Sequence, residues 1–155
     1  MRAPDPSVAS AIRADLDSSP TPYHAVETIR AHLDASGFRQ FAADAGPVGR
    51  WYYAEGGGII AWVVAEHHDA SSPLRIVGAH TDSPNLRIKP QPDVSTLGVA
   101  QLGVEVYGGA LTNSWLDRDL GLAGRVVVHS GDGLQVRLVR DDRPLLRVPQ
   151  LAIHL

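Results

Sequence analysis

The sequence predicts a mixed α/β (α+β) fold, with helices near the start of the chain and most of the strands later. Two observations support this fold class. Apolar residues recur at helical spacing before residue 37, whereas from Arg50 onward short runs of β-branched and aromatic residues are separated by Gly, Pro, Asn and Asp. The chain has 155 residues and is long enough for a core, because a domain usually spans roughly 100–200 residues.

Two helices are expected near the N-terminus. Residues 22–36 have apolar side chains near one helical face, with Thr21 as the N-cap, a proline at the first helical position and Gly37 just beyond the end. A shorter helix is expected over residues 7–17. It should end before Pro20, because a residue that precedes proline disfavours the helical conformation.

A β-hairpin is expected around Gly56, Gly57 and Gly58. The runs RWYYA and IIAWVVAEH flank these glycines, and glycine supplies the positive φ that a tight connection needs. No Lys-Ser/Thr pair or further glycine pattern follows, so the sequence favours a turn over a phosphate-binding loop. The later strand-like runs are LRIVGAHTD, NLRIKPQ, GVEVYGG, GRVVVHS, LQVRLVR and PLLRVPQLAIHL.

The composition changes near residue 90. Pro90 and Pro92 interrupt strand pairing and suit a crossing between two parts of the chain. We therefore expect a boundary here, between a first part that spans residues 1–90 and a second part that spans residues 91–155.

The composition argues against several classes of protein. Lys and Arg number 14 against 17 Asp and Glu, which gives a net charge of −3. A surface that binds nucleic acid needs clustered cations, so this near-neutral balance argues against nucleic acid as a partner. No uncharged apolar run reaches the roughly 18 residues that cross a bilayer, and no signal peptide is recognisable. We expect a cytoplasmic protein with no membrane partner. Without cysteine, any metal must be held by His, Asp and Glu.

Candidate ligands follow the apolar run at residues 74–77. This run predicts a buried strand that presents His80 and Asp82 at its end, where sheets commonly hold ligands. Because side chains alternate along a strand, the two should point to the same face and share one pocket. Such a pair fits a metal-binding histidine oriented by a carboxylate, a general base held in one tautomer, or a plain hydrogen bond in a turn. The triplet alone leaves these alternatives open.

Two further groups of residues also stay open at this point. Asp117, Arg118 and Asp119 lie among apolar residues and fit a structural ion-pair cluster, a subunit contact, or a metal or substrate site. His154 lies in the terminal apolar run LAIHL, where a hydrogen-bonded core histidine is the ordinary expectation.

Three blocks of the sequence occur in the order typical of a known family: GAHTDSPNLRIKP, GVEVYGGALTNSWLDRDLGLAGRVVV and LLRVPQLAIHL. Together with SPTPYHAV, they resemble the N-terminal part of the aspartyl aminopeptidases, which are cytosolic and vacuolar dinuclear zinc enzymes. The resemblance runs from about Ser19 to the last residue. It implies an enzyme that removes N-terminal residues, typically Asp or Glu, from peptide substrates by zinc-activated water. It also implies assembly into large homo-oligomers.

The resemblance assigns roles to individual residues. His80 corresponds to a zinc ligand, and Asp82 to the carboxylate that orients it near the catalytic centre. His154 matches a histidine that reaches toward the substrate of a neighbouring subunit. Residues 1–90 would then be the N-terminal part of a zinc-exopeptidase-type catalytic α/β domain. Residues 91–155 would begin an inserted β-rich dimerisation domain, where Asp117 and Asp119 have a structural or interface role.

The chain departs from the family in length, because members run to several hundred residues and their other metal ligands lie further along the sequence. Its glutamates, Glu27, Glu55, Glu66 and Glu105, include no adjacent pair. A zinc site generally needs three or four protein ligands. We therefore expect the 155 residues alone to lack most metal ligands of the two-zinc centre and to be inactive. The alternative is a non-catalytic oligomerisation or interaction module derived from such an enzyme.

Overall fold

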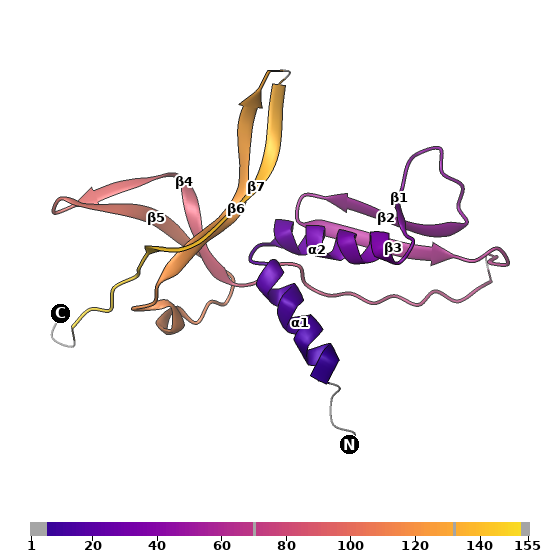
Figure 1. Cartoon of the computed structure of the whole chain (residues 1–155), viewed down its shortest axis with the longest axis horizontal. Coiled ribbons are helices and arrows are strands. Elements are labelled where there is room, and N and C mark those ends of the chain that lie inside the picture. Colours follow the sequence, from indigo (N-terminus) through magenta and orange to yellow (C-terminus); the bar gives the residue numbers. More distant parts are fainter. Residues whose placement is uncertain (1–5, 70, 132, 153–155) are drawn as a thin grey trace. The chain divides into compact units, whose positions relative to one another are not determined.

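The structure is a computed structural model that describes residues 6–69, 71–131 and 133–152 (Figure 1). It confirms the mixed α+β fold class. Its helices are α1 (Pro6–Ser18), α2 (Pro22–Ala35) and the short 3-10 helix η1 (Thr112–Trp115). Its strands are β1 (Arg39–Gln40), β2 (Gly49–Glu55), β3 (Gly58–Val64), β4 (Asn85–Thr96), β5 (Val99–Tyr107), β6 (Leu120–Ser130) and β7 (Gly133–Leu146).

The chain divides into two compact units, each built from two stretches of sequence. The first unit comprises Met1–Asp82 and Ala123–Arg140, and the second comprises Ser83–Leu122 and Asp141–Leu155. Strands β1, β2 and β3 form one sheet in that order, whereas β4 pairs with β5 and β6 pairs with β7. The predicted boundary near residue 90, between a catalytic and an inserted domain, stays a prediction.

Helix α2 begins as its sequence predicts. The hydroxyl of Thr21 accepts a hydrogen bond from the backbone N–H of His24 at 3.4 Å, which satisfies one of the amide donors that a helix leaves unpaired at its N-terminus. Pro22 is the first helical residue, and Gly37 follows the end of the helix with φ of +78°. The two predicted helices therefore form within one or two residues of their expected bounds.

The predicted hairpin is formed by β2 and β3. These strands pair antiparallel from Gly49 opposite Val64 to Glu55 opposite Gly58, and Gly56 in the turn has φ of +57°. The turn residues thus supply the backbone conformation that their glycines predict. Strand β1 pairs in parallel with β2, along the edge of β2 that does not pair with β3.

The core of the first unit lies on β2. Trp51 and Tyr52 are consecutive and both buried, so both faces of this strand are covered. The ring of Phe41 packs edge-on against Trp51 with ring centres 6.0 Å apart, whereas the guanidinium carbon of Arg30 on α2 lies 5.9 Å from the centre of the Tyr52 ring. Val26 of α2 is also buried. The hairpin and α2 are therefore one packed body.

The second unit is built around the β4–β5 hairpin. Its pairing shifts register between Ile88 and Asp93, the stretch that contains Pro90 and Pro92. The two prolines therefore interrupt the pairing as predicted, although β4 continues through them. Leu116 forms an isolated parallel bridge with Val148, which joins the segment after η1 to the segment after β7.

The strand predicted at residues 74–77 is absent, and this expectation was wrong. The segment belongs to no strand, and the exposed fractions of Leu74, Ile76 and Val77 are 78%, 86% and 96%. An apolar run becomes a buried strand only where a neighbouring strand supplies hydrogen bonds and a packed layer covers its side chains. No sheet of the described residues includes this segment. In the same residues, no helix is long and apolar enough to cross a membrane.

Candidate functional site

The predicted pairing of His80 with Asp82 is present. Nδ1 of His80 lies 2.9 Å from Oδ1 of Asp82, across a bend of the chain at Thr81. The side chain of His80 is 91% exposed and that of Asp82 is 35% exposed. The two residues therefore form a pair on the surface of the first unit, and the expectation that they share a pocket was wrong.

The contact fixes which nitrogen of the imidazole carries the proton. An ionised carboxylate only accepts hydrogen bonds, so Nδ1 of the neutral ring must donate its hydrogen to Asp82. The lone pair then lies on Nε2, on the opposite edge of the ring. A histidine held in this way can bind a metal ion or accept a proton through Nε2. Both chemical interpretations of the sequence therefore fit the geometry.

Thr81, between the two, was not singled out from the sequence. Its Oγ1 donates a hydrogen bond of 2.6 Å to the carbonyl oxygen of Gly57. The sequence does not predict this partner, which lies 24 residues earlier.

The acidic residues around Arg118 make local structural contacts within the second unit. Oδ1 of Asp117 accepts a hydrogen bond from the N–H of Gln150 at 3.2 Å, and Asp119 forms an ion pair with Arg147. The guanidinium of Arg118 donates to the carbonyl of Ser114 at 3.4 Å. These contacts favour the structural alternative for this cluster. Across the described ranges, no group of three or more His, Asp and Glu side chains is placed to hold a metal ion.

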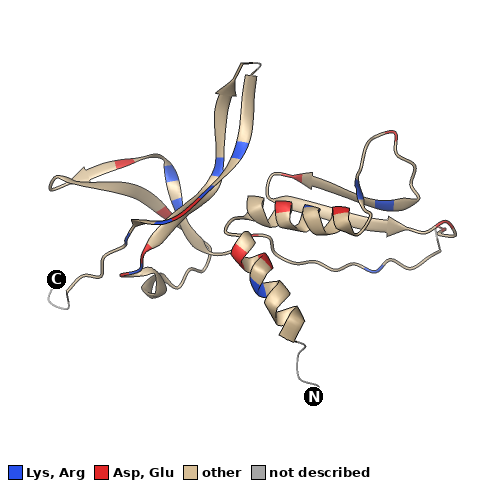
Figure 2. Cartoon of the chain, viewed as in Figure 1, with Lys and Arg blue, Asp and Glu red and all other residues tan. Residues whose placement is uncertain are grey.

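His154, the third candidate, lies outside the described residues. The positions of Lys and Arg and those of Asp and Glu are both spread over the elements of each unit (Figure 2). Among the other histidines, burial of the ring and the positive charge of Arg140 lower the pKa of His24. This histidine faces Thr21, with Nδ1 2.7 Å from the hydroxyl oxygen, and belongs to the start of α2.

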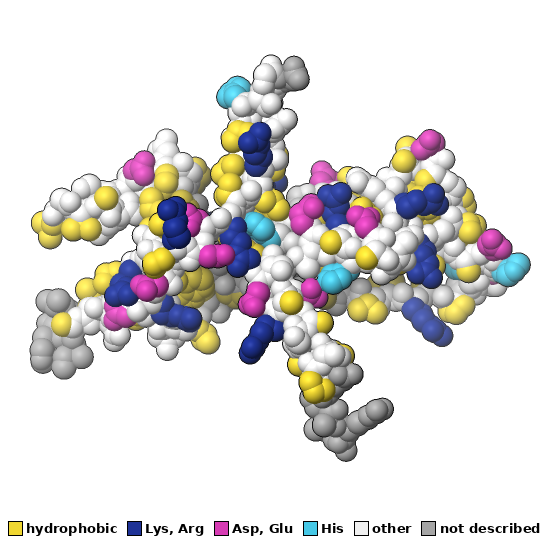
Figure 3. Space-filling view, viewed as in Figure 1, with side chains coloured by type: hydrophobic (Ala, Val, Ile, Leu, Met, Phe, Trp, Pro, Cys, Tyr) yellow, Lys and Arg dark blue, Asp and Glu magenta, His cyan; other side chains and the backbone are white. Residues whose placement is uncertain are grey.

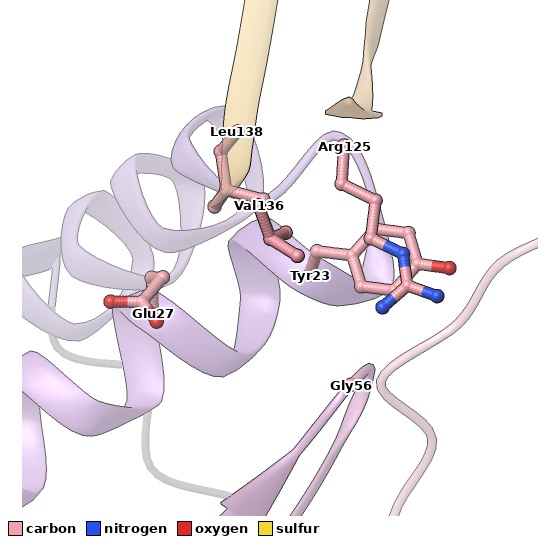
Figure 4. A pocket seen from close by; sticks show the side chains of 6 residues that line it. All are labelled: Tyr23, Glu27, Gly56, Arg125, Val136 and Leu138. Carbon is pink, nitrogen blue, oxygen red and sulfur yellow. The ribbon is translucent and has the colours of Figure 1, made fainter. Parts of the chain in front are cut away.

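A hollow of about 340 Å³ lies in the first unit (Figure 4). The guanidinium of Arg125 lies over the ring of Tyr23, 4.5 Å from its centre, and Glu27 forms an ion pair of 2.9 Å with Arg30. The residues that line the hollow are Tyr23, Glu27, Gly56, Arg125, Val136 and Leu138. Its charged groups therefore already have partners within the unit.

The second unit has a larger groove of about 680 Å³. Most of its lining is apolar and comes from β4, β5, η1, the start of β6 and the end of β7, including Leu86, Leu102, Trp115 and Leu145. Hydrophobic side chains are exposed over this unit in Figure 3. Exposed apolar patches of this kind are typical of surfaces that bind another protein segment.

Residues 16–155 match the family described as aminopeptidase I zinc metalloprotease (M18). This chain belongs to the M18 family. It is 59% identical over 143 residues to "Probable M18 family aminopeptidase 2" of Streptomyces coelicolor. The matched stretch covers 90% of this chain and 32% of that protein. The protein of the same name from Mycobacterium bovis is 47% identical over 143 residues, covering 90% of this chain and 33% of that protein. The chain thus spans about a third of the length of these curated relatives.

Several solved structures have the same fold over this stretch. The Ape4 chain in a complex with Nbr1 matches 99% of this M18 chain at a TM-score of 0.82 and 38% identity, with 32% of that chain covered. The mApe1 of Chaetomium thermophilum matches 97% at a TM-score of 0.84 and 30% identity, with 36% covered. The S. cerevisiae mApe1, solved as a dodecamer, matches 95% at a TM-score of 0.85 and 26% identity, with 36% covered. The resemblance seen in the sequence is therefore confirmed for the family.

The donor chemistry of the pair fits the metal of the M18 family. Imidazole nitrogen and carboxylate oxygen are ordinary zinc ligands, and a zinc-binding histidine almost always donates its other ring N–H to an acceptor such as a carboxylate. The contact between His80 and Asp82 has this arrangement, with Nε2 directed away from the carboxylate. A catalytic zinc takes three protein ligands, so the pair supplies part of such a set.

Proposed function

We propose that these residues form part of a zinc-dependent aminopeptidase that hydrolyses the first peptide bond of peptide substrates. The observation that supports this proposal most strongly is the 2.9 Å contact between His80 and Asp82, which lies within the segment that matches the M18 family. In this enzyme His80 is a metal ligand through Nε2. Asp82 holds the imidazole in the tautomer and orientation that metal binding needs.

Zinc, when bound, activates water for attack and polarises the carbonyl of the substrate. Asp82 accepts the Nδ1–H of His80 and so holds Nε2 ready for the metal. We propose two zinc ions in the complete enzyme and a preference for an N-terminal Asp or Glu. Both features are supported by the resemblance to the aspartyl aminopeptidases, which also supports a cytoplasmic location.

We propose that the 155-residue chain is inactive by itself. His80 and Asp82 offer one imidazole and one carboxylate that is already engaged with that imidazole, and three ligands are the usual minimum for a catalytic zinc. The remaining ligands would come from the parts of the family members' sequences that lie outside the third matched by this chain.

Assembly is the second part of the proposal. The S. cerevisiae relative forms a dodecamer, and the second unit of this chain presents an apolar groove of about 680 Å³. We propose that the complete protein is a homo-oligomer and that this groove is covered in it. The same groove favours the alternative function, a non-catalytic interaction module, because an apolar surface can bind a partner without any chemistry.

The test compares two proteins: the 155-residue chain, and a chimera in which this chain replaces the matching third of the Streptomyces coelicolor relative. Hydrolysis of chromogenic amides of Asp, Glu and Leu is measured with zinc, after chelation, and after zinc is restored. We expect no turnover by the chain alone. We expect zinc-dependent turnover by the chimera, with the Asp or Glu amide cleaved faster than the Leu amide.

The parent enzyme, assayed in parallel, shows that the conditions permit activity. A chimera that assembles like its parent but cleaves none of the amides would overturn the catalytic proposal and support the interaction module. Zinc-dependent turnover by the 155-residue chain would overturn the proposal that it is inactive by itself. Mass measurement in solution reports the assembly of each protein.

A further inference from the structure

The hydrogen bond of Thr81 connects the candidate site to the packed core of the first unit. Its hydroxyl donates to the carbonyl oxygen of Gly57 at 2.6 Å, and the contact is partly buried. The acceptor is in the turn between β2 and β3, next to the last register pair of the hairpin, Glu55 opposite Gly58. The segment that contains His80 and Asp82 is thus attached to the β2–β3 hairpin. Strand β2 of this hairpin contains the buried Trp51 and Tyr52.

The position of the acceptor is itself fixed by packing. A Cβ atom added to Gly57 would lie 2.8 Å from Cβ of Pro22, closer than real Cβ contacts, so the turn is in direct contact with the first residue of α2. Gly56, beside it, has φ of +57°, which an L side chain rarely adopts. The carbonyl that accepts from Thr81 is therefore held by both the hairpin and the helix.

The two contacts turn this attachment into an orientation. Thr81 lies at a bend of the chain and is bonded to the carbonyl of Gly57, and the side chains on either side of it meet each other, with Nδ1 of His80 2.9 Å from Oδ1 of Asp82. The apolar residues before the pair belong to no sheet, so strand pairing does not set this orientation in the described residues.

We propose that Thr81 is a positioning residue, whose hydrogen bond to the carbonyl of Gly57 sets the direction in which His80 and Asp82 present the metal-binding edge of the imidazole. The proposal rests on the proposed function, because that function gives the pair its chemical role. Thr81 itself touches neither metal nor substrate in this scheme. It acts through the backbone that it shares with its two neighbours.

The test uses the metal-free 155-residue chain labelled with ¹⁵N in its histidine rings. NMR is recorded at a pH above the titration range of histidine, where the shifts of Nδ1 and Nε2 report which nitrogen carries the proton. In the parent chain we expect widely separated shifts for His80, as a ring held in the Nδ1–H tautomer requires. In Thr81→Val, which lacks the hydroxyl at similar volume, we expect this separation to shrink toward that of an exposed histidine.

Two further variants make the result specific. Thr81→Ser keeps the hydroxyl and should retain the parent signals, whereas Thr28→Val makes the same change at the helix hydroxyl that accepts from Ser19 at 3.2 Å and should leave His80 unchanged. Indole signals of Trp51 and Trp62 report whether each variant is folded. Parent-like signals of His80 in folded Thr81→Val would overturn the proposal.

If Thr81→Val does not fold, Thr81→Ser decides the question. A folded serine variant with parent-like His80 signals supports the proposal, and one with altered signals overturns it, because the hydroxyl is still present. A serine variant that also fails to fold shows that Thr81 acts on the fold as a whole, which likewise overturns a role specific to the pair. None of these measurements needs zinc or turnover, so they are independent of the outcome for the chimera.

Discussion

Replacing Tyr52 with alanine should destabilise the first unit far more than the same replacement at its neighbour, Tyr53. Tyr52 is 3% exposed and Tyr53 is 47% exposed, although they are consecutive residues of one strand. Removing a buried aromatic side chain typically lowers the free energy of unfolding by about 3–5 kcal/mol, through lost burial and the cavity that remains. Removing the exposed ring should cost about 0.5 kcal/mol, as for most surface substitutions.

The size of this effect follows from how little of the first unit is buried. Among the described residues, the buried hydrophobic side chains are Val26, Trp51 and Tyr52. Because whole domains are stable by only about 5–15 kcal/mol, the loss of one of these three leaves little margin. The tyrosine also lies beneath Arg30 of α2, so its removal loosens the contact between the helix and the hairpin.

Urea denaturation followed by tryptophan fluorescence measures both variants. We expect a clearly lower unfolding midpoint for Tyr52→Ala and a midpoint near that of the parent for Tyr53→Ala. Equal shifts for the two variants would contradict the burial of Tyr52 and the packing of α2 on this face of β2. The slope of each transition shows whether the folded state has the same compactness in both.

Local signals in the sequence were sufficient wherever a few neighbouring residues determine the structure. Thr21 and Pro22 predicted the start of α2 because capping involves only the first turn of a helix. The glycines around Gly57 predicted the hairpin for the same reason. The contact between His80 and Asp82 was expected from their spacing of two residues and is formed, although the chain bends at Thr81 between them.

The predictions that failed depend on distant partners. The run that contains Ile76 has the composition of a buried strand, but burial requires a second surface, and no sheet of the described residues provides one. The partner of Thr81 is likewise a tertiary contact, since Gly57 is 24 residues away and its carbonyl is reached only after the hairpin folds. The sequence therefore indicated which residues form the pair but did not indicate what holds it or how exposed it is.

Changing Asp82 to asparagine in the chimera should weaken zinc binding by about 10–100-fold, the usual effect of losing a group that orients a metal ligand. The amide has nearly the same shape but no charge, so it accepts the Nδ1–H of His80 more weakly and orients the imidazole less firmly. Activity at limiting zinc should fall with the affinity, and excess zinc should restore part of it. Competition with a chromogenic chelator measures the affinity directly.

The first unit contains a matched control for this change. Oδ1 of Asp15 lies 2.8 Å from Nε2 of His32, a second histidine–carboxylate pair on the surface with almost the same separation. Asp15→Asn makes the same chemical change outside the segment GAHTD, and we expect it to leave zinc affinity unchanged. Equal losses in the two variants would show that the effect comes from charge alone. A loss confined to Asp82→Asn would show that the effect depends on the place of the pair and on the ring nitrogen that it leaves free, because Asp82 contacts Nδ1 of His80 whereas Asp15 contacts Nε2 of His32.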